Sequence, residues 1–279
     1  MNSHLQTRTL TDALNLVDEV LRSRGSELVH SEQREHLALC FAKVRYPRYF
    51  DSWAFTAAEF DNAVKQVAQC APHLAQKLEE PTHPNDLTVV GNCSLDLRFS
   101  PDPNGAKPIA LQLCNGNRAK GASVTSSRAR LYSNQLVGLP TEDSETVYFY
   151  APESEPQLSA ASLARQVFAD KGKAIRTGIT LQFPVAQTTN LMDNSWVKEL
   201  VSTCGLYSIK NYVSAGKALV DHHGFFAQET QVVQVEYRIT SKKLAEIVID
   251  QPFLVFFADK RGVHAAVWFS WDSFSGSAS

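Results

Sequence analysis

The sequence predicts an α+β protein in which a helical N-terminal part precedes a larger part built from mixed or antiparallel sheets. Up to residue 80, apolar residues recur at the three- and four-residue spacings of amphipathic helices. From Leu87 onward, short runs alternate between apolar and polar residues, which is the period of strands. No linker-like stretch separates the two parts. We therefore predict a single domain over residues 1–279, mainly helical over 1–80 and mainly sheet with short helices over 87–279.

Composition argues against several classes of function. The 279 residues are 44% hydrophobic and 20% charged, with a net charge of −2. No basic stripe and no run of 18 apolar residues occurs, so we predict neither a nucleic-acid partner nor a membrane-spanning segment. The five cysteines are scattered and odd in number, which favours buried, reduced thiols and a cytoplasmic location over a disulfide framework. They are Cys40, Cys70, Cys93, Cys114 and Cys204.

Three amphipathic helices are predicted before residue 70. The first follows Thr9 or Thr11, either of which is a suitable N-cap, and the second spans Ser31–Val44. The third runs from Thr56 to Gln69 and begins with a capping box, because a glutamate stands three residues after Thr56. The apolar side of the first helix is expected to carry Leu14, Leu16, Val17, Val20 and Leu21.

Strand patterns begin with Leu87–Phe99, and Ile109–Cys114 is predicted to be a short buried strand. The segment Asn115–Arg130 is polar and contains glycine, so we predict no regular structure there. Within it, Gly116–Gly121 invites a phosphate-loop interpretation but lacks the Gly-Lys-Ser/Thr ending, which favours a flexible loop. Further strands are predicted at Leu131–Pro140 and Thr146–Tyr150, and a helix from Leu158.

The last third of the chain holds a long polar loop between strands. A strand-like run ends at Val220 and is followed by Asp221-His222-His223-Gly224 and a glutamine-rich segment of about twenty residues. Two apolar runs follow, Pro252–Ala258 and Val263–Ser270, which we expect to pair as buried antiparallel strands. A long loop inside a compact domain is usually functional.

This order of elements resembles the C-terminal part of the serpins. In that family a strand leads into a glycine-containing hinge, an exposed reactive-centre loop follows, and two core strands close the chain. Ala218–Gly224 is similar to the hinge approach, Asp250–Phe256 to the strand with a Pro-Phe pair, and Gly262–Phe269 to the final strand. The resemblance implies a serpin-like fold with a reduced N-terminal helical part. The resemblance extends upstream over Val147–Gly172 and Gly178–Leu206, and more weakly over Phe60–Phe99.

The most chemistry-like cluster is Asp221, His222 and His223. One histidine oriented by the carboxylate would suit a general base. On an extended chain, however, neighbouring side chains point to opposite faces, so both imidazoles should not reach one metal ion. The favoured interpretation is that the three residues form hydrogen bonds at the hinge. We predict no metal and no cofactor.

The resemblance also implies a test of inhibitory function. In inhibitory serpins the cleaved loop inserts into a sheet, so alternate hinge residues become buried and should be small. The hinge here is Gly224, Phe225, Phe226 and Ala227, with Glu229 shortly after it. One alternation would bury Phe225 and the Glu229 carboxylate, which we expect to overpack the sheet and to cost on the order of several kcal/mol.

Counted from the hinge, the bond that the resemblance implies is cut joins Arg238 and Ile239, a sequence that suits a trypsin-like protease. The cost of burying the hinge side chains outweighs the match at Arg238-Ile239, because that cost is a physical obstacle to insertion whereas a single arginine at one position can occur by chance. We therefore predict a non-inhibitory serpin-like protein recruited as a binding scaffold or to act on a small molecule. Two alternatives stay open: a biosynthetic small-molecule enzyme on the same scaffold, and a trypsin-like serine protease inhibitor. The predicted partner is an unidentified small molecule or protein.

Overall fold

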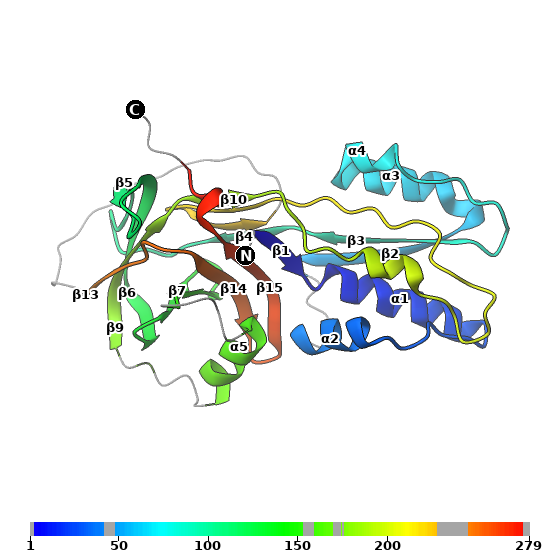
Figure 1. The fold of residues 1–279 in the computed structure, drawn as a ribbon, viewed down its shortest axis with the longest axis horizontal. Helices are drawn as coiled ribbons and strands as arrows, with labels where there is room; N and C mark the ends of the chain where they lie inside the picture. The colour runs from blue at the N-terminus through cyan, green and yellow to red at the C-terminus, as the bar shows by residue number, and fades with distance from the viewer. Residues whose placement is uncertain are drawn as a thin grey trace. The chain divides into compact units, whose positions relative to one another are not determined.

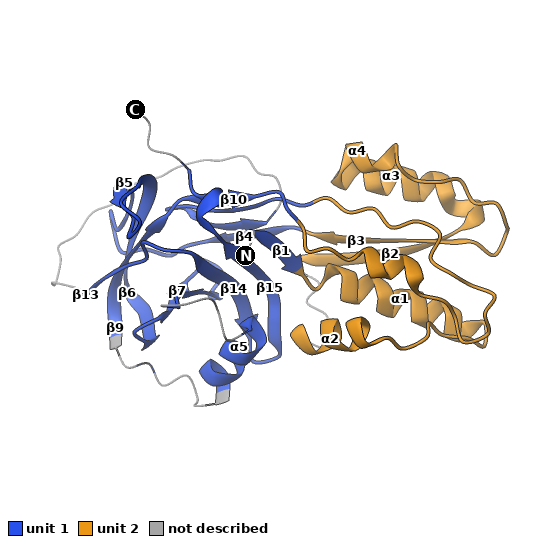
Figure 2. Cartoon of the chain, in the orientation of Figure 1, with its two compact units in different colours: residues 1–6, 94–190, 216–279 blue, residues 7–93, 191–215 orange. Residues whose placement is uncertain are grey.

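The computed structural model describes residues 3–41, 48–152, 159–169, 174, 176–227 and 245–275 (Figure 1). The chain divides into two compact units, each assembled from segments far apart in the sequence (Figure 2). Unit 1 comprises residues 1–6, 94–190 and 216–279, and unit 2 comprises residues 7–93 and 191–215. Each unit is described by itself, and the single domain over 1–279 stays a prediction.

Unit 2 is built on a two-stranded antiparallel sheet of β2 (Phe50–Thr56) and β3 (Leu87–Cys93), which carries a helix on each face. A Cβ at Gly91 would lie 2.7 Å from the Thr9 side chain, so α1 (Thr9–Ser23) covers the face of Gly91. The next residue, Val90, packs with Val67 of α3 (Phe60–Cys70) on the opposite face. The remaining helical segments are α2 (Glu32–Cys40), α4 (Pro72–Ala75), η1 (Ala57–Glu59) and η2 (Ser195–Glu199).

Charged residues lie inside unit 2 beside the apolar side of α1. The guanidinium of Arg8, which is 1% exposed, donates to both carboxylate oxygens of Asp12 at 2.9 and 2.8 Å. Asp18, also buried, accepts from the Leu28 backbone N–H and pairs with Arg34. These buried carboxylates are tolerated because they are paired and hydrogen-bonded.

The predicted helix starts are partly correct. The threonine N-cap of α1 is wrong, since the helix begins at Thr9 with Arg8 as N-cap and without a side-chain cap. The capping box is confirmed: Glu59 Oε2 accepts from the Thr56 backbone N–H at 2.9 Å, and η1 and α3 follow. α2 begins after Ser31, whose Oγ accepts from the Arg34 N–H, and it ends at Cys40.

Unit 1 contains a nine-stranded mixed sheet with the order β1-β15-β14-β8-β7-β6-β9-β13, and β5 pairs with β6. The pairs from β15 to β9 are antiparallel and β13 is parallel to β9, which confirms the predicted mixed or antiparallel sheets. The strands are β1 (His4–Thr7), β5 (Ala106–Gln112), β6 (Arg118–Ser133), β7 (Leu136–Pro140), β8 (Thr146–Tyr150), β9 (Arg176–Pro184), β13 (Ala245–Val248), β14 (Phe253–Asp259) and β15 (Gly262–Phe269).

The core of this unit is aromatic. Phe149, Phe183 and Phe253 are fully buried, and the ring centroids of Phe149 and Phe183 lie 4.8 Å apart. The helix α5 (Ala160–Ala169) packs on β14 and β15. The predicted antiparallel pairing and burial of the last two strands are confirmed.

The predicted loop Asn115–Arg130 is the main error of the sequence analysis. This segment forms most of β6, a strand of 16 residues that pairs with β5, β7 and β9. Its small polar side chains fit a strand interior because their hydroxyls find partners: Thr125 Oγ1 lies 2.8 Å from Thr180 Oγ1, and Ser126 Oγ donates to the Ser100 carbonyl. The flexible-loop interpretation of Gly116–Gly121 is therefore wrong for Arg118–Gly121, whereas Gly116 and Asn117 do lie in the turn between β5 and β6.

Two neighbouring strands also differ from expectation. The predicted strand Leu87–Phe99 is interrupted at Ser94, so that β3 pairs with β2 whereas β4 (Leu95–Arg98) joins another sheet. The strand expected over Ile109–Cys114 begins earlier, at Ala106, and only Leu111 of β5 is fully buried. β5 has a single strand neighbour, β6, which leaves much of it at the surface.

All five cysteines lie in the described residues and none forms a disulfide, as predicted. Their burial was overestimated, because Cys114 and Cys204 are exposed and only Cys93 is fully buried. In the described parts of the chain, no helix has both the length and the apolar composition needed to cross a membrane.

Candidate functional site

The sequence-predicted hinge lies in a second sheet of unit 1, which has four strands in the order β10-β11-β12-β4. Its other members are β10 (Ala186–Thr188), β11 (Ala218–Val220) and β12 (Gly224–Ala227). β12 is antiparallel to both of its neighbours, with Phe225 opposite Val220 of β11 and Leu97 of β4. The hinge residues are therefore an inner strand of this sheet.

A two-residue turn joins β11 to β12. The Asp221 N–H donates to the Gly224 carbonyl at 3.1 Å, which closes the hairpin around His222 and His223. Asp221 Oδ1 accepts the His223 N–H at 2.7 Å and the Gly224 N–H at 3.3 Å. Asp221, His223 and Gly224 thus form the predicted kind of hydrogen bonds, in the turn that joins β11 to β12, and the role of this turn as a hinge stays a prediction.

The two imidazoles lie side by side, with ring centroids 3.9 Å apart and ring planes tilted by 38°. The prediction that they point to opposite faces is wrong, because these residues occupy a turn and the alternation of side chains holds only for extended chain. Among the described residues, however, no group of three or more His, Cys, Asp or Glu side chains is placed to hold a metal ion.

The environment of His222 disfavours its charged form. Partial burial lowers the pKa of His222 below its ordinary value of 6.5, and the neighbouring His223 lowers it further, whereas the Asp221 carboxylate opposes both effects. The Asp221 carboxylate already accepts two backbone N–H groups. The cluster therefore contains the residue types of a general base and an orienting carboxylate. The Asp221 carboxylate, however, stabilises the turn by accepting backbone N–H groups.

Gly224 is required by the close approach of β4. A Cβ at this position would lie 2.5 Å from the Leu97 carbonyl oxygen and 2.9 Å from the Arg98 Cα, both of them backbone atoms. The Phe99 N–H also donates to the His223 carbonyl at 2.8 Å. The turn and the start of β12 are thus fixed against β4 and the residue that follows it.

The phenylalanine expected to overpack the sheet fits inside it. Phe225 is 0% exposed and Ala227 is 1% exposed, and the sheet neighbours of Phe225 are themselves buried. Phe226 points to the other face and is partly exposed. In the uncleaved chain Phe225 is therefore already accommodated in the sheet, opposite Val220 and Leu97, whereas the cost of inserting a cleaved loop stays a prediction. Glu229, Arg238 and Ile239 lie outside the described residues.

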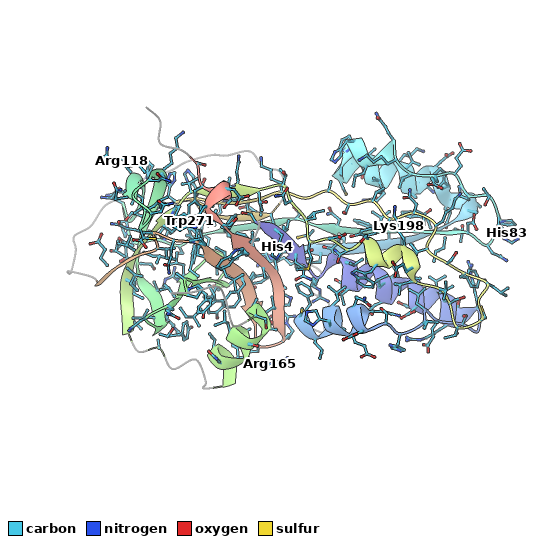
Figure 3. The ribbon with its side chains drawn as sticks, viewed as in Figure 1. His4, His83, Arg118, Arg165, Lys198 and Trp271 are labelled. Carbon is cyan, nitrogen blue, oxygen red and sulfur yellow. The ribbon has the colours of Figure 1, made fainter. Side chains whose placement is uncertain are left out.

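A shallow hollow in unit 2 contains none of the predicted site residues. It lies between the start of α3 and residues 80–84, with Phe60, Asp61 and His83 among its lining (Figure 3 labels His83). His83 Nδ1 accepts the Asn85 N–H at 3.1 Å, and Asp86 accepts the backbone N–H groups of the preceding turn. The polar groups of His83 and Asp86 thus mainly form hydrogen bonds within the turn over residues 82–86.

One thiol with a lowered pKa, that of Cys204, is not among the site residues predicted from the sequence. Cys204 is exposed, and hydrogen bonds with the Ser202 and Ser26 hydroxyls lower the pKa of its thiol to about 7. Ser26 reaches Cys204 because the backbone at Leu28 bridges to Ser202 within unit 2. No local sequence signal marks this contact, since the residues are far apart in the chain.

No family model matches the chain, and no curated protein is significantly similar to it in sequence. Among solved structures, the chain resembles cleaved Serpin 42Da with 13% identity and a TM-score of 0.52, over 100% of this chain and 92% of that chain. The thermophilic serpin tengpin in its native state is 11% identical with a TM-score of 0.51, over 96% and 88% of the two chains. SRPN18 from Anopheles gambiae is 12% identical with a TM-score of 0.51, over 99% of this chain and 93% of that chain.

These likenesses and the sheet topology define the class of fold. The chain has a divergent serpin-like fold of the α+β class, with a large mixed sheet and few helices. The fold predicted from the resemblance is confirmed. Fold and function are separate properties, so activity is argued from the hinge itself.

Proposed function

We propose that this chain is a serpin-like binding scaffold that does not trap proteases by loop insertion. The observation that supports the proposal is the position of the hinge. Residues Gly224–Ala227 already form β12, which pairs with β11 on one side and with β4 on the other. A protease trap of this kind releases free energy when an unpaired strand enters the sheet. These four residues are already paired in the uncleaved chain, so cleavage would release no further free energy from their pairing.

The sequence after the hinge supports the same proposal. Phe225 and Ala227 face the interior, and if a strand continued beyond Ala227 its two-residue period would bring Glu229 to that same face. Burying an unpaired carboxylate is costly, so further extension of β12 is opposed. The segment between β12 and β13, with the hinge that anchors it, is proposed as the surface that binds a partner.

Limited proteolysis tests the proposal. Arg238, Lys242 and Lys243, which lie outside the described residues, are the sites where we expect trypsin to cut. The cut chain should melt at the same temperature as the intact chain or lower. The Glu229→Ala variant should gain heat resistance after the cut if the carboxylate is the obstacle, and Gln228→Ala is the matched control. A large rise in the melting temperature of the cut wild-type chain, or an SDS-stable complex with trypsin, would contradict the proposal.

A trypsin-like inhibitor is the second candidate, and one observation favours it. Because Phe225 is accommodated in β12, the hinge is able to take up a strand conformation within the sheet. Arg238-Ile239 would then be the cleaved bond. The same trypsin experiment separates the two candidates, since a covalent complex forms only with an inhibitor.

We also propose that the protein resides in a reducing compartment such as the cytoplasm. The support is that none of the five cysteines forms a disulfide. A thiol count on denatured protein isolated from its native source should give five reactive thiols. A count of three or fewer would place the protein in an oxidising compartment.

A further inference from the structure

A thiol and an imidazole meet on the surface of unit 2, and they are independent of the hinge and of the proposed function. His36 and Cys40 lie four residues apart on α2, so they share one face of the helix. The Cys40 sulfur is 3.7 Å from His36 Nε2. His36 is exposed and Cys40 is half-buried, whereas Leu37 on the inner side of the helix is 4% exposed and anchors it.

This separation matches the edge of a metal coordination tetrahedron. A tetrahedral zinc ion bonded to sulfur at about 2.3 Å and to nitrogen at about 2.0–2.1 Å holds these two donor atoms about 3.6 Å apart. The observed 3.7 Å therefore places both donors at coordination distance from a single ion without moving the helix backbone. Thiolate and imidazole are also the ligand pair that zinc and related soft metals prefer over magnesium or calcium.

We propose that His36 and Cys40 form a two-ligand site for a soft divalent metal ion such as zinc. Nε2 of His36 donates its lone pair, and the Cys40 thiol loses its proton to solvent as the sulfur–metal bond forms. The affinity should therefore rise with pH. No third His, Cys, Asp or Glu from the described residues joins the pair, so the remaining coordination positions are open to water or to an incoming ligand.

The chain contains a matched control. On α3, Gln66 and Cys70 have the same four-residue spacing, and the amide nitrogen of Gln66 lies 4.0 Å from the Cys70 sulfur. Both residues are half-buried. An amide nitrogen has no lone pair to give a metal, and the amide oxygen is a hard ligand that soft metals bind poorly, so this pair reproduces the spacing without a soft second ligand.

Cadmium binding to the reduced, full-length protein tests the site, monitored by the thiolate-to-cadmium charge-transfer absorption. The background carries Cys114→Ser and Cys204→Ser, which remove the two exposed thiols. We expect each chain to bind one cadmium ion tightly. Cys40→Ser should abolish this binding, and His36→Ala should weaken it by at least about tenfold, the scale on which even outer contacts of metal ligands act. Cys70→Ser should leave it unchanged.

A gain of binding provides the complementary test. Gln66→His creates a second His–Cys pair at the same spacing and should add a second strong equivalent. The proposal is overturned if His36→Ala binds cadmium as tightly as the background protein, or if Cys70→Ser weakens binding as much as Cys40→Ser. A stoichiometry of one cadmium ion per two chains, together with a dimer in gel filtration, would show that a second chain completes the coordination and would contradict the open two-ligand site.

Discussion

Two hairpins of unit 1 are built on the same four-residue turn but differ in what stabilises them. The hinge hairpin, residues 218–227, turns through Asp221-His222-His223-Gly224. The core hairpin, residues 253–269, turns through Asp259-Lys260-Arg261-Gly262. In both, the aspartate Oδ1 accepts the backbone N–H two residues later, at 2.7 Å from His223 and at 2.8 Å from Arg261. The hydrogen bond from the aspartate side chain is thus the same in the two turns.

The flanking strands differ. In the core hairpin, β14 and β15 pair over the full length of β14, and the six residues Phe253–Ala258 are all buried. In the hinge hairpin, β11 contributes only three residues, and β12 depends on its second neighbour, β4. The glycines also differ: Gly262 adopts a φ of 129°, whereas Gly224 is required because β4 lies against it. A turn motif therefore specifies where the chain reverses, and the strands around it decide how firmly the hairpin is held.

The largest expected effect tests whether β12 is truly an inner strand. Phe225→Ala should lower the free energy of unfolding by about 3–5 kcal/mol, because the ring is fully buried between two strands. Phe226→Ala is the matched control and should cost much less, since that side chain is partly exposed. Urea unfolding measures both. If the two variants are equally stable, Phe225 does not lie within the sheet.

The two glycines should respond differently to alanine. Gly224→Ala is expected to cost about 2–3 kcal/mol, because the new methyl group meets the backbone of β4 and forces the strands apart. Gly262→Ala should cost about 1–2 kcal/mol through backbone strain alone. Unfolding measurements give the two values. A tolerated alanine at Gly224 would show that β4 does not press on the turn.

The core turn should be sensitive to acid at low pH. Burial raises the pKa of Asp259, but hydrogen bonds from Arg261 and His264 outweigh it and hold the pKa below 3.8. The stability that the ionised Asp259 carboxylate adds to the folded chain is therefore complete above about pH 4 and is lost as the pH falls through the lowered pKa. Asp259→Asn should cost about 1–2 kcal/mol at pH 7 and progressively less toward pH 2. A pH-independent difference between variant and wild type would contradict this account.

The hinge turn should be sensitive at a higher pH, with the smallest effect of the four. The pKa of His222 is lowered by burial and by His223, so its protonation opposes the folded hairpin. The stabilisation is present above the ordinary pKa of 6.5 and is lost as the pH falls through the lowered value. The protection factor of the Phe225 amide, which is its exchange rate corrected for the intrinsic rate at each pH, should fall between pH 7 and pH 5, and His222→Gln should remove that fall. An equal fall in the variant would assign the effect to another group.

Local patterns predicted the elements whose burial is continuous or strictly periodic. The apolar runs of β14 and β15, the capping box at Thr56 and the strand Thr146–Tyr150 were all identified because their signal lies within a few residues. The error at β6 has the opposite cause. Its serines and threonines resemble a loop until strands β7 and β9 supply partners for them.

The candidate site was found in part by the same local signals. Asp221 and Gly224 were recognised as the start of a hinge, and their turn hydrogen bonds follow from the residue types alone. The close contact of the two imidazoles, the lowered pKa of Cys204 and the contact of His36 with Cys40 depend on geometry that sequence reasoning did not supply.

By itself, then, the sequence determined the α+β class, the serpin-like order of the C-terminal strands and the position of the turn Asp221–Gly224. These properties follow from side-chain period and turn chemistry, which act over a few residues. Only the tertiary structure decided that Phe225 is buried, because its fate depends on whether β4 pairs with β12 across more than a hundred residues of chain. Pairing over such a separation depends on how the whole chain packs, and no short window of sequence contains that information.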